Sequence, residues 1–313
     1  MIILLSIFLF IIGAACGSFV GAMTWRMRHN ELIDEKKTAV KSKAKSAKTS
    51  AAKSTSKSKK IEKLSWVNGR SQCENCNHQL AWYDLLPIVS WLWLKGKCRY
   101  CGKKIGLTAL LLEISVGAAF VVSLLFWPSV FMANSFEQLG TLQIVGFVLW
   151  LISVVLMAAL LVYDARWRLL PDKLLLPLVG VALAQNIINF IVYATYSWQI
   201  AWSYLGDIAL AFIPVFGVYL VLYMVSRGKW VGFGDVKFGV AVALILADWK
   251  MALVVLVGAN LLGSLFVLPS LVTKKLKVNS QIAFGPFLIV ATFLTFFFGR
   301  PLIEWAEINL FLL

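Results

Sequence analysis

The chain alternates long apolar runs with shorter polar connections. Seven of the runs are long enough to cross a hydrocarbon core of about 30 Å as helices. They lie near 2–25, 107–127, 142–163, 174–196, 205–226, 251–272 and 281–299. An eighth run, 236–247, is shorter, contains glycine and is followed by Asp248 and Lys250. The pattern predicts an all-α polytopic membrane protein with about eight transmembrane helices.

The composition agrees with this prediction. Hydrophobic residues make up 60% of the 313 residues, which include 13 Trp. The mean hydropathy is +0.81. A soluble globular domain carries clearly less apolar and more charged sequence, so this class is excluded.

Positive charge is concentrated in one connection. Residues 26–104 hold 19 of the 30 Lys and Arg but 6 of the 15 Asp and Glu, and so supply 13 of the 15 net positive charges. Because basic connections stay in the cytoplasm, this segment is predicted to be cytoplasmic and the N-terminus to lie outside. The later connections follow the same alternation, since 164–173 is basic and 128–141 has no Lys or Arg. Lys250 and Arg300 are exceptions, because they are basic residues on the predicted outer side.

Part of this basic connection has low complexity. Residues 36–63 consist mostly of Lys, Ala and Ser and contain no aromatic residue. Such a segment cannot bury enough surface to offset its chain entropy, which predicts a disordered linker. Its lysines favour the anionic lipid of the inner leaflet, by about 1 kcal/mol each. A nucleic-acid-binding arm is the less favoured alternative, and no nucleic acid is expected as a partner.

Two C-x-x-C pairs follow the linker. Cys73 and Cys76 form the first pair, Cys98 and Cys101 form the second, and 21 residues separate the pairs. Four thiolates at this spacing are typical of a closed, structural Zn²⁺ site of the zinc-ribbon type. Disulfides or unrelated thiols are the alternatives, although a reducing cytoplasm disfavours disulfides. His78 is expected to be a surface residue rather than a ligand.

Asp235 interrupts a strongly apolar region, in the segment GKWVGFGDVKFG at 228–239. It could simply cap the short helix that follows it. Asp164, however, ends the third span, and counting spans places both carboxylates at the same, cytoplasmic, face. Two carboxylates that approach closely share a proton, and such a pair can activate water to attack a peptide carbonyl and then protonate the leaving nitrogen.

Several neighbours are candidates for supporting roles. Asp172, the other carboxylate that could face Asp235, begins the fourth span and is assigned to capping or support. Gly232 and Gly234 would let a substrate backbone approach closely. Lys237 could stabilise a nearby charge or extend toward the membrane surface.

Further segments complete a pattern. They are GSFVGAMTWRM at 17–27, the two C-x-x-C pairs with WYDLLPIVSWLWLKGKCRYC at 82–101, Glu113, D-x6-P-D at 164–172 and GFGDVK at 232–237. Because these motifs occur in this order on eight predicted spans, the chain resembles the type IV prepilin peptidases. These are polytopic aspartic proteases of the G-x-G-D class. The resemblance covers almost the whole chain.

The resemblance implies that Asp164 and Asp235 are the catalytic pair. It implies cleavage of prepilins or pseudopilins, which carry a short basic leader, at the cytoplasmic face of the bacterial inner membrane, with the N-terminus periplasmic. It also implies methylation of the new N-terminal amine by S-adenosylmethionine, an activity associated with the cysteine region. No glycine-rich methyltransferase fingerprint is visible in the sequence, so no residue is assigned to this cofactor.

Spans, charge and motifs together divide the chain into four parts. These are the first transmembrane helix (1–25), a basic linker (26–65), a cytoplasmic region with the four paired cysteines (66–106) and a membrane-embedded peptidase core (107–313).

Two other functions stay open. An ion- or proton-coupled transporter could use the same carboxylates, with Asp207, Asn186, Asn189 and Asn260 lining a path. The asparagines are better explained as interhelical hydrogen-bonding residues, and the sequence shows no convincing internal repeat of the kind that transporters carry. A scaffold that docks partners through a zinc knuckle would leave the G-x-G-D segment unexplained.

Overall fold

The computed structural model describes residues 1–46, 65, 71–73, 75–76, 78–127, 140–273 and 283–310. Within these ranges the chain is helical, and its β-structure is limited to two isolated bridges. The membrane-length helices and their neighbours are α1 (Ile2–Ser46), α3 (Leu107–Leu125), α5 (Thr141–Trp167), α6 (Asp172–Tyr196), α7 (Trp198–Phe212), α8 (Val218–Ser226), α9 (Phe233–Leu246), α10 (Trp249–Val272) and α11 (Gly285–Leu310). Two short elements, η1 (Trp82–Leu85) and α2 (Val89–Trp93), lie in the cysteine region.

The predicted membrane architecture is confirmed. Among the described residues, seven helical segments are long and apolar enough to span a bilayer, with α7 and α8 forming one of them. The predicted short span corresponds to α9, which has 14 residues and is therefore about 21 Å long. More than half of the side chains of α9 are buried, so this helix is enclosed by its neighbours rather than by lipid.

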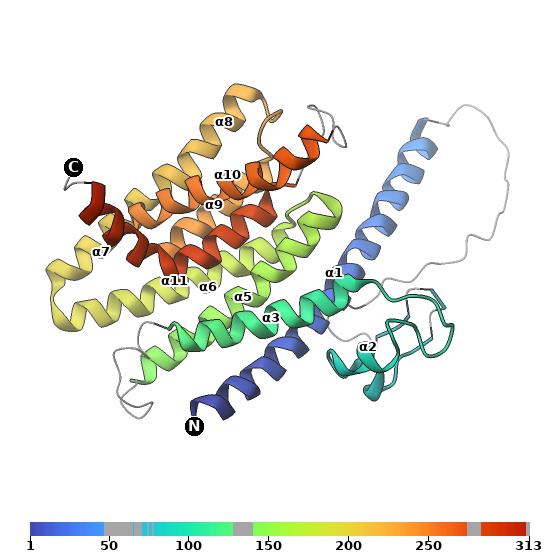
Figure 1. The fold of residues 1–313 in the computed structure, drawn as a ribbon. Helices are drawn as coiled ribbons and strands as arrows, with labels where there is room; N and C mark the ends of the chain where they lie inside the picture. The colour runs from blue at the N-terminus through green and yellow to red at the C-terminus, as the bar shows by residue number, and fades with distance from the viewer. Residues whose placement is uncertain are drawn as a thin grey trace. The chain divides into compact units, whose positions relative to one another are not determined.

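The chain divides into two compact units, which are described separately. The cysteine unit is Ala14–Ser115, and the helical unit combines Met1–Gly13 with Val116–Leu313. Within the helical unit, α9 packs against α6, α7, α8, α10 and α11, and α5 packs against α6 and α11 (Figure 1). The helix that begins within the G-x-G-D segment is thus surrounded by other described helices of its unit.

A π-helical turn, η3 (Ile213–Gly217), joins α7 to α8. Pro214 lies in this turn and cannot donate a helical hydrogen bond, which explains the local widening. The widened turn faces α9, where Gly239 lies directly against the carbonyl oxygen of Val215. Any side chain at position 239 would collide with that backbone, so glycine is required for the close approach of the two elements.

Two predicted boundaries are corrected. The fifth span begins at Trp198 instead of 205, because polar residues such as Gln199 and Ser203 lie within the helix and lower its hydropathy. The segment 36–63, predicted to be disordered, is helical as far as Ser46, and its remainder lies outside the described residues. Ala and Lys are good helix formers and here continue a helix that has already begun, so its extension requires no new nucleation.

Candidate functional site

Asp164 lies in the last turn of α5 and is 5% exposed. The helix ends three residues later, at Trp167, because the next residue, Arg168, adopts a left-handed conformation with φ of 56°; the Arg168 N–H bonds to the Asp164 carbonyl at 2.8 Å. The side-chain Oδ2 atom of Asp164 is buried and has no hydrogen-bond partner among the described residues. A buried carboxylate oxygen without a partner is costly, and such atoms are typical of functional sites.

Gly285, the first residue of α11, shapes the space around Asp164. A Cβ atom added to Gly285 would lie 2.6 Å from Oδ2 of Asp164, a distance that real Cβ contacts do not show. The backbone N–H of Gly285 also approaches the carboxylate. Sequence analysis missed this residue, for which the Gly-Pro dipeptide at the start of the last span was the available signal.

Asp235 is the third residue of α9, and its backbone N–H bonds to the Gly232 carbonyl at 3.1 Å. Its carboxylate lies within electrostatic range of Asp164, so the structure brings the two predicted aspartates to one end of the helical unit. Gly232 lies beside Oδ2 of Asp235, whereas Gly234 faces Leu170, with 3.1 Å between its potential Cβ and the leucine Cβ. Gly234 therefore lets the segment connecting α5 and α6 pack against the start of α9.

Tyr219 is a second residue that sequence analysis missed. It lies on α8, is 2% exposed, and packs edge-to-face on Phe284 with 5.8 Å between ring centroids. Its hydroxyl is buried without a well-formed hydrogen bond to the described residues and lies within electrostatic range of Asp235. A single tyrosine in an apolar span carries no sequence signal, so only the packing of α8 on α9 reveals this neighbour.

Asp172 and Lys237, both predicted to have supporting roles, pair with each other. The Lys237 Nζ atom lies 2.7 and 2.9 Å from the two Asp172 oxygens, and it also lies 5.2 Å from the centroid of the Phe233 ring. Asp172 is in the first turn of α6, as expected for an N-terminal carboxylate. The ion pair joins the start of α6 to the start of α9, so Asp172 pairs with Lys237 and not with Asp164 or Asp235.

The four predicted cysteines converge in the cysteine unit. The Sγ atoms of Cys73, Cys76, Cys98 and Cys101 all lie within 4.8 Å of one another, and those of Cys73 and Cys101 are 3.9 Å apart. None of the four forms a disulfide. Around a tetrahedral Zn²⁺ with bonds of about 2.3 Å, sulfur atoms are about 3.8 Å apart, so the cluster fits a metal of this kind.

Backbone hydrogen bonds form each C-x-x-C turn. The N–H of Cys73 bonds to the His78 carbonyl at 3.0 Å, and the N–H of Cys98 bonds to the Lys103 carbonyl at 2.8 Å. Partial burial acts to raise the pKa of Cys73, but hydrogen bonds from Cys76, Asn75 and Cys98 lower it to about 7. These turns direct the four thiols toward one point.

A polar cluster supports the two turns. Arg99 and Tyr100 donate hydrogen bonds to Asp84 at 2.8 and 3.0 Å, and the ring of Tyr100 lies 3.7 Å from that of His78. Burial alone would raise the pKa of Asp84, but these hydrogen bonds hold the pKa below its ordinary value. His78 thus contacts an aromatic ring, and the potential ligand group found among the described residues contains cysteines only.

Glu113 is buried near the start of α3 and accepts a hydrogen bond from the Ile88 N–H at 2.7 Å. Ile88 has a φ of 64°, which is a strained conformation for a β-branched residue. The carboxylate therefore holds the turn before α2 in place, and Glu113 acts within the cysteine unit.

The asparagines of the transporter hypothesis form structural hydrogen bonds. Asn186 donates to the Leu244 carbonyl at 2.7 Å, which joins α6 to α9. Asn189 donates to the Tyr204 hydroxyl at 3.2 Å, which joins α6 to α7. Asn260 donates to the Leu256 carbonyl within its own helix.

Two family models match the sequence. The bacterial peptidase A24 N-terminal domain matches residues 11–127, and the type IV leader peptidase family matches residues 150–268. The two matches together span about three quarters of the chain. No solved structure matches.

Curated proteins named prepilin leader peptidase/N-methyltransferase are also similar. The protein from Dichelobacter nodosus is 28% identical over 232 residues, which are 74% of this chain and 72% of the relative. The one from Aeromonas salmonicida strain A449 is 26% identical over 245 residues, 78% of this chain and 76% of the relative. The one from Dickeya chrysanthemi is 28% identical over 221 residues, which are 71% of this chain and 70% of the relative. This chain belongs to the type IV leader peptidase family, a family of aspartic peptidases.

Proposed function

We propose that this protein cleaves the leader peptide from type IV prepilins and pseudopilins, with Asp164 and Asp235 as its catalytic pair. The observation that carries the proposal is the approach of these two carboxylates at one end of the helical unit, where an oxygen of Asp164 is buried and unpartnered. The names of the curated relatives supply the substrate class and the second activity.

The pair provides both an acid and a base. Because two close carboxylates do not both ionise comfortably, one retains a proton while the other accepts a proton from the attacking water. The protonated carboxyl then donates to the leaving nitrogen of the peptide bond. The glycine at position 285 lets the start of α11 pack closely against the Asp164 carboxylate.

The proposed cleavage takes place at the cytoplasmic face of the bacterial inner membrane, with the N-terminus in the periplasm. Asp164 lies close in sequence to Arg166 and Arg168 at the end of α5, and Asp235 lies close to Lys229 in the connection before α9. The positive-inside tendency places basic connections in the cytoplasm. The proposed prepilin substrate carries a short basic leader before its apolar helix, and the same tendency keeps this leader at the cytoplasmic face.

We assign the cysteine cluster to a structural Zn²⁺ ion held by Cys73, Cys76, Cys98 and Cys101. Four thiolates leave no open coordination position, so the ion contributes to the stability of the region instead of to the reaction. The spread of sulfur distances supports this ligand set.

Replacing Cys98 by serine is expected to reduce bound zinc from about one ion per chain to almost none, because structural sites depend on all four thiolates. Elemental analysis of the purified protein measures this loss. Cys16→Ser is the matched control, since Cys16 lies in α1 outside the cluster. Unchanged zinc content in Cys98→Ser would contradict the assignment.

Methylation of the new N-terminal amine by S-adenosylmethionine is proposed from the names of the relatives and from the family resemblance. The described residues provide no assigned binding site for this cofactor, so no step of the reaction is derived through it. The cofactor supplies the methyl group when bound.

Both activities can be tested in one assay. The purified protein in detergent is incubated with a synthetic prepilin, and the product is weighed by mass spectrometry with and without S-adenosylmethionine. The expected result is loss of the leader, followed by a gain of one methyl group when the cofactor is present. Several different prepilins left intact by the wild-type protein would reject the proposal.

The exposed ion pair between Asp172 and Lys237 is expected to contribute little. Lys237→Met should lower the free energy of unfolding by about 0.5 kcal/mol, because water screens both partners. Cleavage should fall by no more than about threefold. Lys229→Met is the matched control, because it removes another lysine near the start of α9. Thermal unfolding measures the change in stability, and initial cleavage rates measure the change in activity. A loss of activity similar to that of an aspartate variant would show that the pair positions the site.

A further inference from the structure

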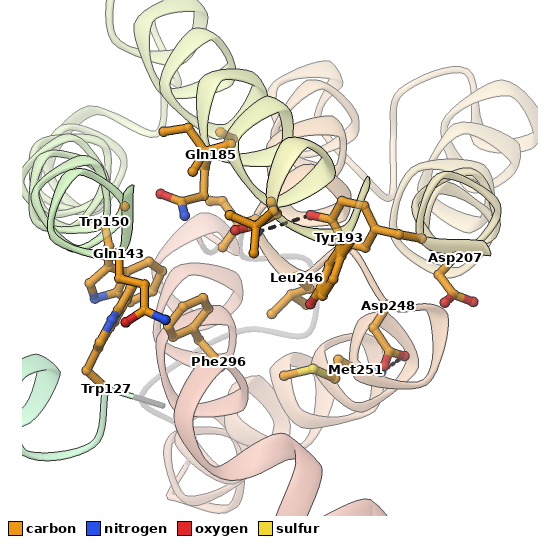
Figure 2. Close-up of a pocket in the computed structure, with 18 of the residues that line it drawn as sticks. Trp127, Gln143, Trp150, Gln185, Tyr193, Asp207, Leu246, Asp248, Met251 and Phe296 are labelled. Carbon is orange, nitrogen blue, oxygen red and sulfur yellow. Dashed lines mark hydrogen bonds between the residues drawn. The ribbon is translucent and has the colours of Figure 1, made fainter. Parts of the chain in front are cut away.

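The helical unit contains a cavity of about 720 Å³. Helices α5, α6, α7 and α11 and the turn between α9 and α10 surround it. Figure 2 shows Trp127, Trp150 and Phe296 on one side of this cavity and Asp207 and Asp248 on the other. A volume of this size is typical of a site for an organic ligand.

The cavity lies at the opposite end of the unit from the aspartate pair. On α5 it is lined by Gln143, whereas Asp164 is 21 residues further along the same helix. At a rise of about 1.5 Å per residue, the two positions are roughly 30 Å apart, which is the thickness of a hydrocarbon core. The lining of α5 ends at Ser153, which is still 11 residues before Asp164, so the cavity belongs to a separate site.

Two buried polar atoms in the lining have no partner among the described residues. They are the Oε1 atom of Gln185, which accepts a hydrogen bond, and the Nε1 atom of Trp127, which donates one. Buried polar atoms are almost always hydrogen-bonded, so this lining suits a ligand that both donates and accepts hydrogen bonds. The Gln185 amide lies over Gly146, where a Cβ would come within 2.8 Å of Nε2, so α5 limits its movement.

The lining also carries charges of both signs. Asp207 and Asp248 are acidic, and Arg300 is basic. Asp248 also accepts hydrogen bonds from the first N–H groups of α10, at 2.8 Å from Lys250 and 3.3 Å from Met251. A complementary ligand has a cationic donor for the carboxylates and an anionic acceptor for the guanidinium.

Part of the lining is apolar and exposed. Phe126, Leu142 and Ile200 border the cavity and are each exposed by more than a third. In a membrane protein these side chains face lipid, so a ligand in the cavity can extend an apolar part into the bilayer. The cavity thus combines a polar, doubly charged interior with an apolar border.

We propose that this cavity binds the headgroup of a phospholipid that carries a primary amine, of the phosphatidylethanolamine type. The ammonium donates to Asp207 and to the Oε1 atom of Gln185, while the phosphate accepts from Arg300 and from the Nε1 atom of Trp127. The acyl chains leave across the apolar border. A phosphatidylcholine headgroup has the same charges but no N–H to donate, so it satisfies the phosphate partners only.

The test uses the full-length protein, delipidated in detergent and then given defined amounts of phosphatidylethanolamine or phosphatidylcholine. Native mass spectrometry measures the fraction of protein with one bound lipid. The expected result is an apparent affinity for phosphatidylethanolamine about tenfold higher than for phosphatidylcholine. In Asp207→Asn this preference should fall to about twofold or less, because one charged acceptor is lost.

Glu304→Gln is the matched control, because it removes an exposed carboxylate on α11 outside the cavity. It should keep the preference of the wild-type protein. Gln185→Met, which replaces the amide by an apolar group of similar length, should also lose the preference and provides a second variant if Asp207→Asn does not fold. Equal binding of the two lipids to the wild-type protein would overturn the proposal, as would an unchanged preference in both cavity variants. Displacement of the lipid by an equal concentration of soluble phosphoethanolamine would overturn the assignment to a membrane lipid.

Discussion

Asp235→Asn is expected to lower the rate of prepilin cleavage by about a thousandfold or more, and Asp164→Asn by a similar amount. Each amide is nearly the same size as the carboxyl group that it replaces but can neither accept the proton of the attacking water nor return it. The structure places the two carboxylates within electrostatic range, so the loss of either leaves a single acid that cannot perform both transfers. Initial cleavage rates of a synthetic prepilin measure the effect.

The control for these variants is Asp172→Asn. Its carboxylate is exposed and pairs with Lys237, so most of the activity should remain. Size-exclusion profiles and helical content of all three variants should match the wild-type protein, because none of the substitutions changes the volume of a buried side chain. An inactive Asp172→Asn together with an active Asp164→Asn would show that the catalytic pair is wrongly assigned.

Gly285→Ala is expected to reduce cleavage by about a hundredfold, although the substitution adds only one methyl group. The new Cβ would lie 2.6 Å from the Oδ2 atom of Asp164, so either the carboxylate or the start of α11 must move. A shift of about 1 Å in a catalytic group is enough for a loss of this size. The steady-state rate with saturating substrate measures it.

Gly180→Ala is the matched control, since no atom lies within 4 Å of a Cβ at that position in α6. It should retain full activity and unfold at a slightly higher temperature, because alanine favours a helix over glycine. If Gly285→Ala is as active as Gly180→Ala, the close packing of α11 against Asp164 is not needed for the reaction.

Features encoded by local sequence were predicted successfully. Apolar runs located the membrane helices, and the spacing of the C-x-x-C pairs predicted a cluster that the structure brings within 4.8 Å. Counting spans placed Asp164 and Asp235 at one face, and the structure brings them within electrostatic range of each other. Their catalytic roles stay a prediction.

Features that depend on helix packing were not predicted. The approach of Gly285 to Asp164 depends on the way that α11 packs against α5, and the pairing of Lys237 with Asp172 depends on the crossing of α9 and α6. Residues far apart in sequence create these contacts, so no spacing along the chain reports them. The extension of α1 to Ser46 was missed for a different reason, because hydropathy marks where a helix leaves the membrane but not where it ends.

The short length of α9 also determines how the protein can be assembled. At about 21 Å, α9 does not reach across a hydrocarbon core of about 30 Å, and its first turn carries a charged residue, so it is a poor candidate for insertion by itself. Its buried side chains contact α10 and α11, which the ribosome synthesises later. It also contacts α6, α7 and α8, which precede it in the chain, so these helices can enclose α9 first, and α10 and α11 complete its enclosure. Gly285, which lies against Asp164, belongs to α11, so the surroundings of the aspartate pair are complete only after α11 has been synthesised.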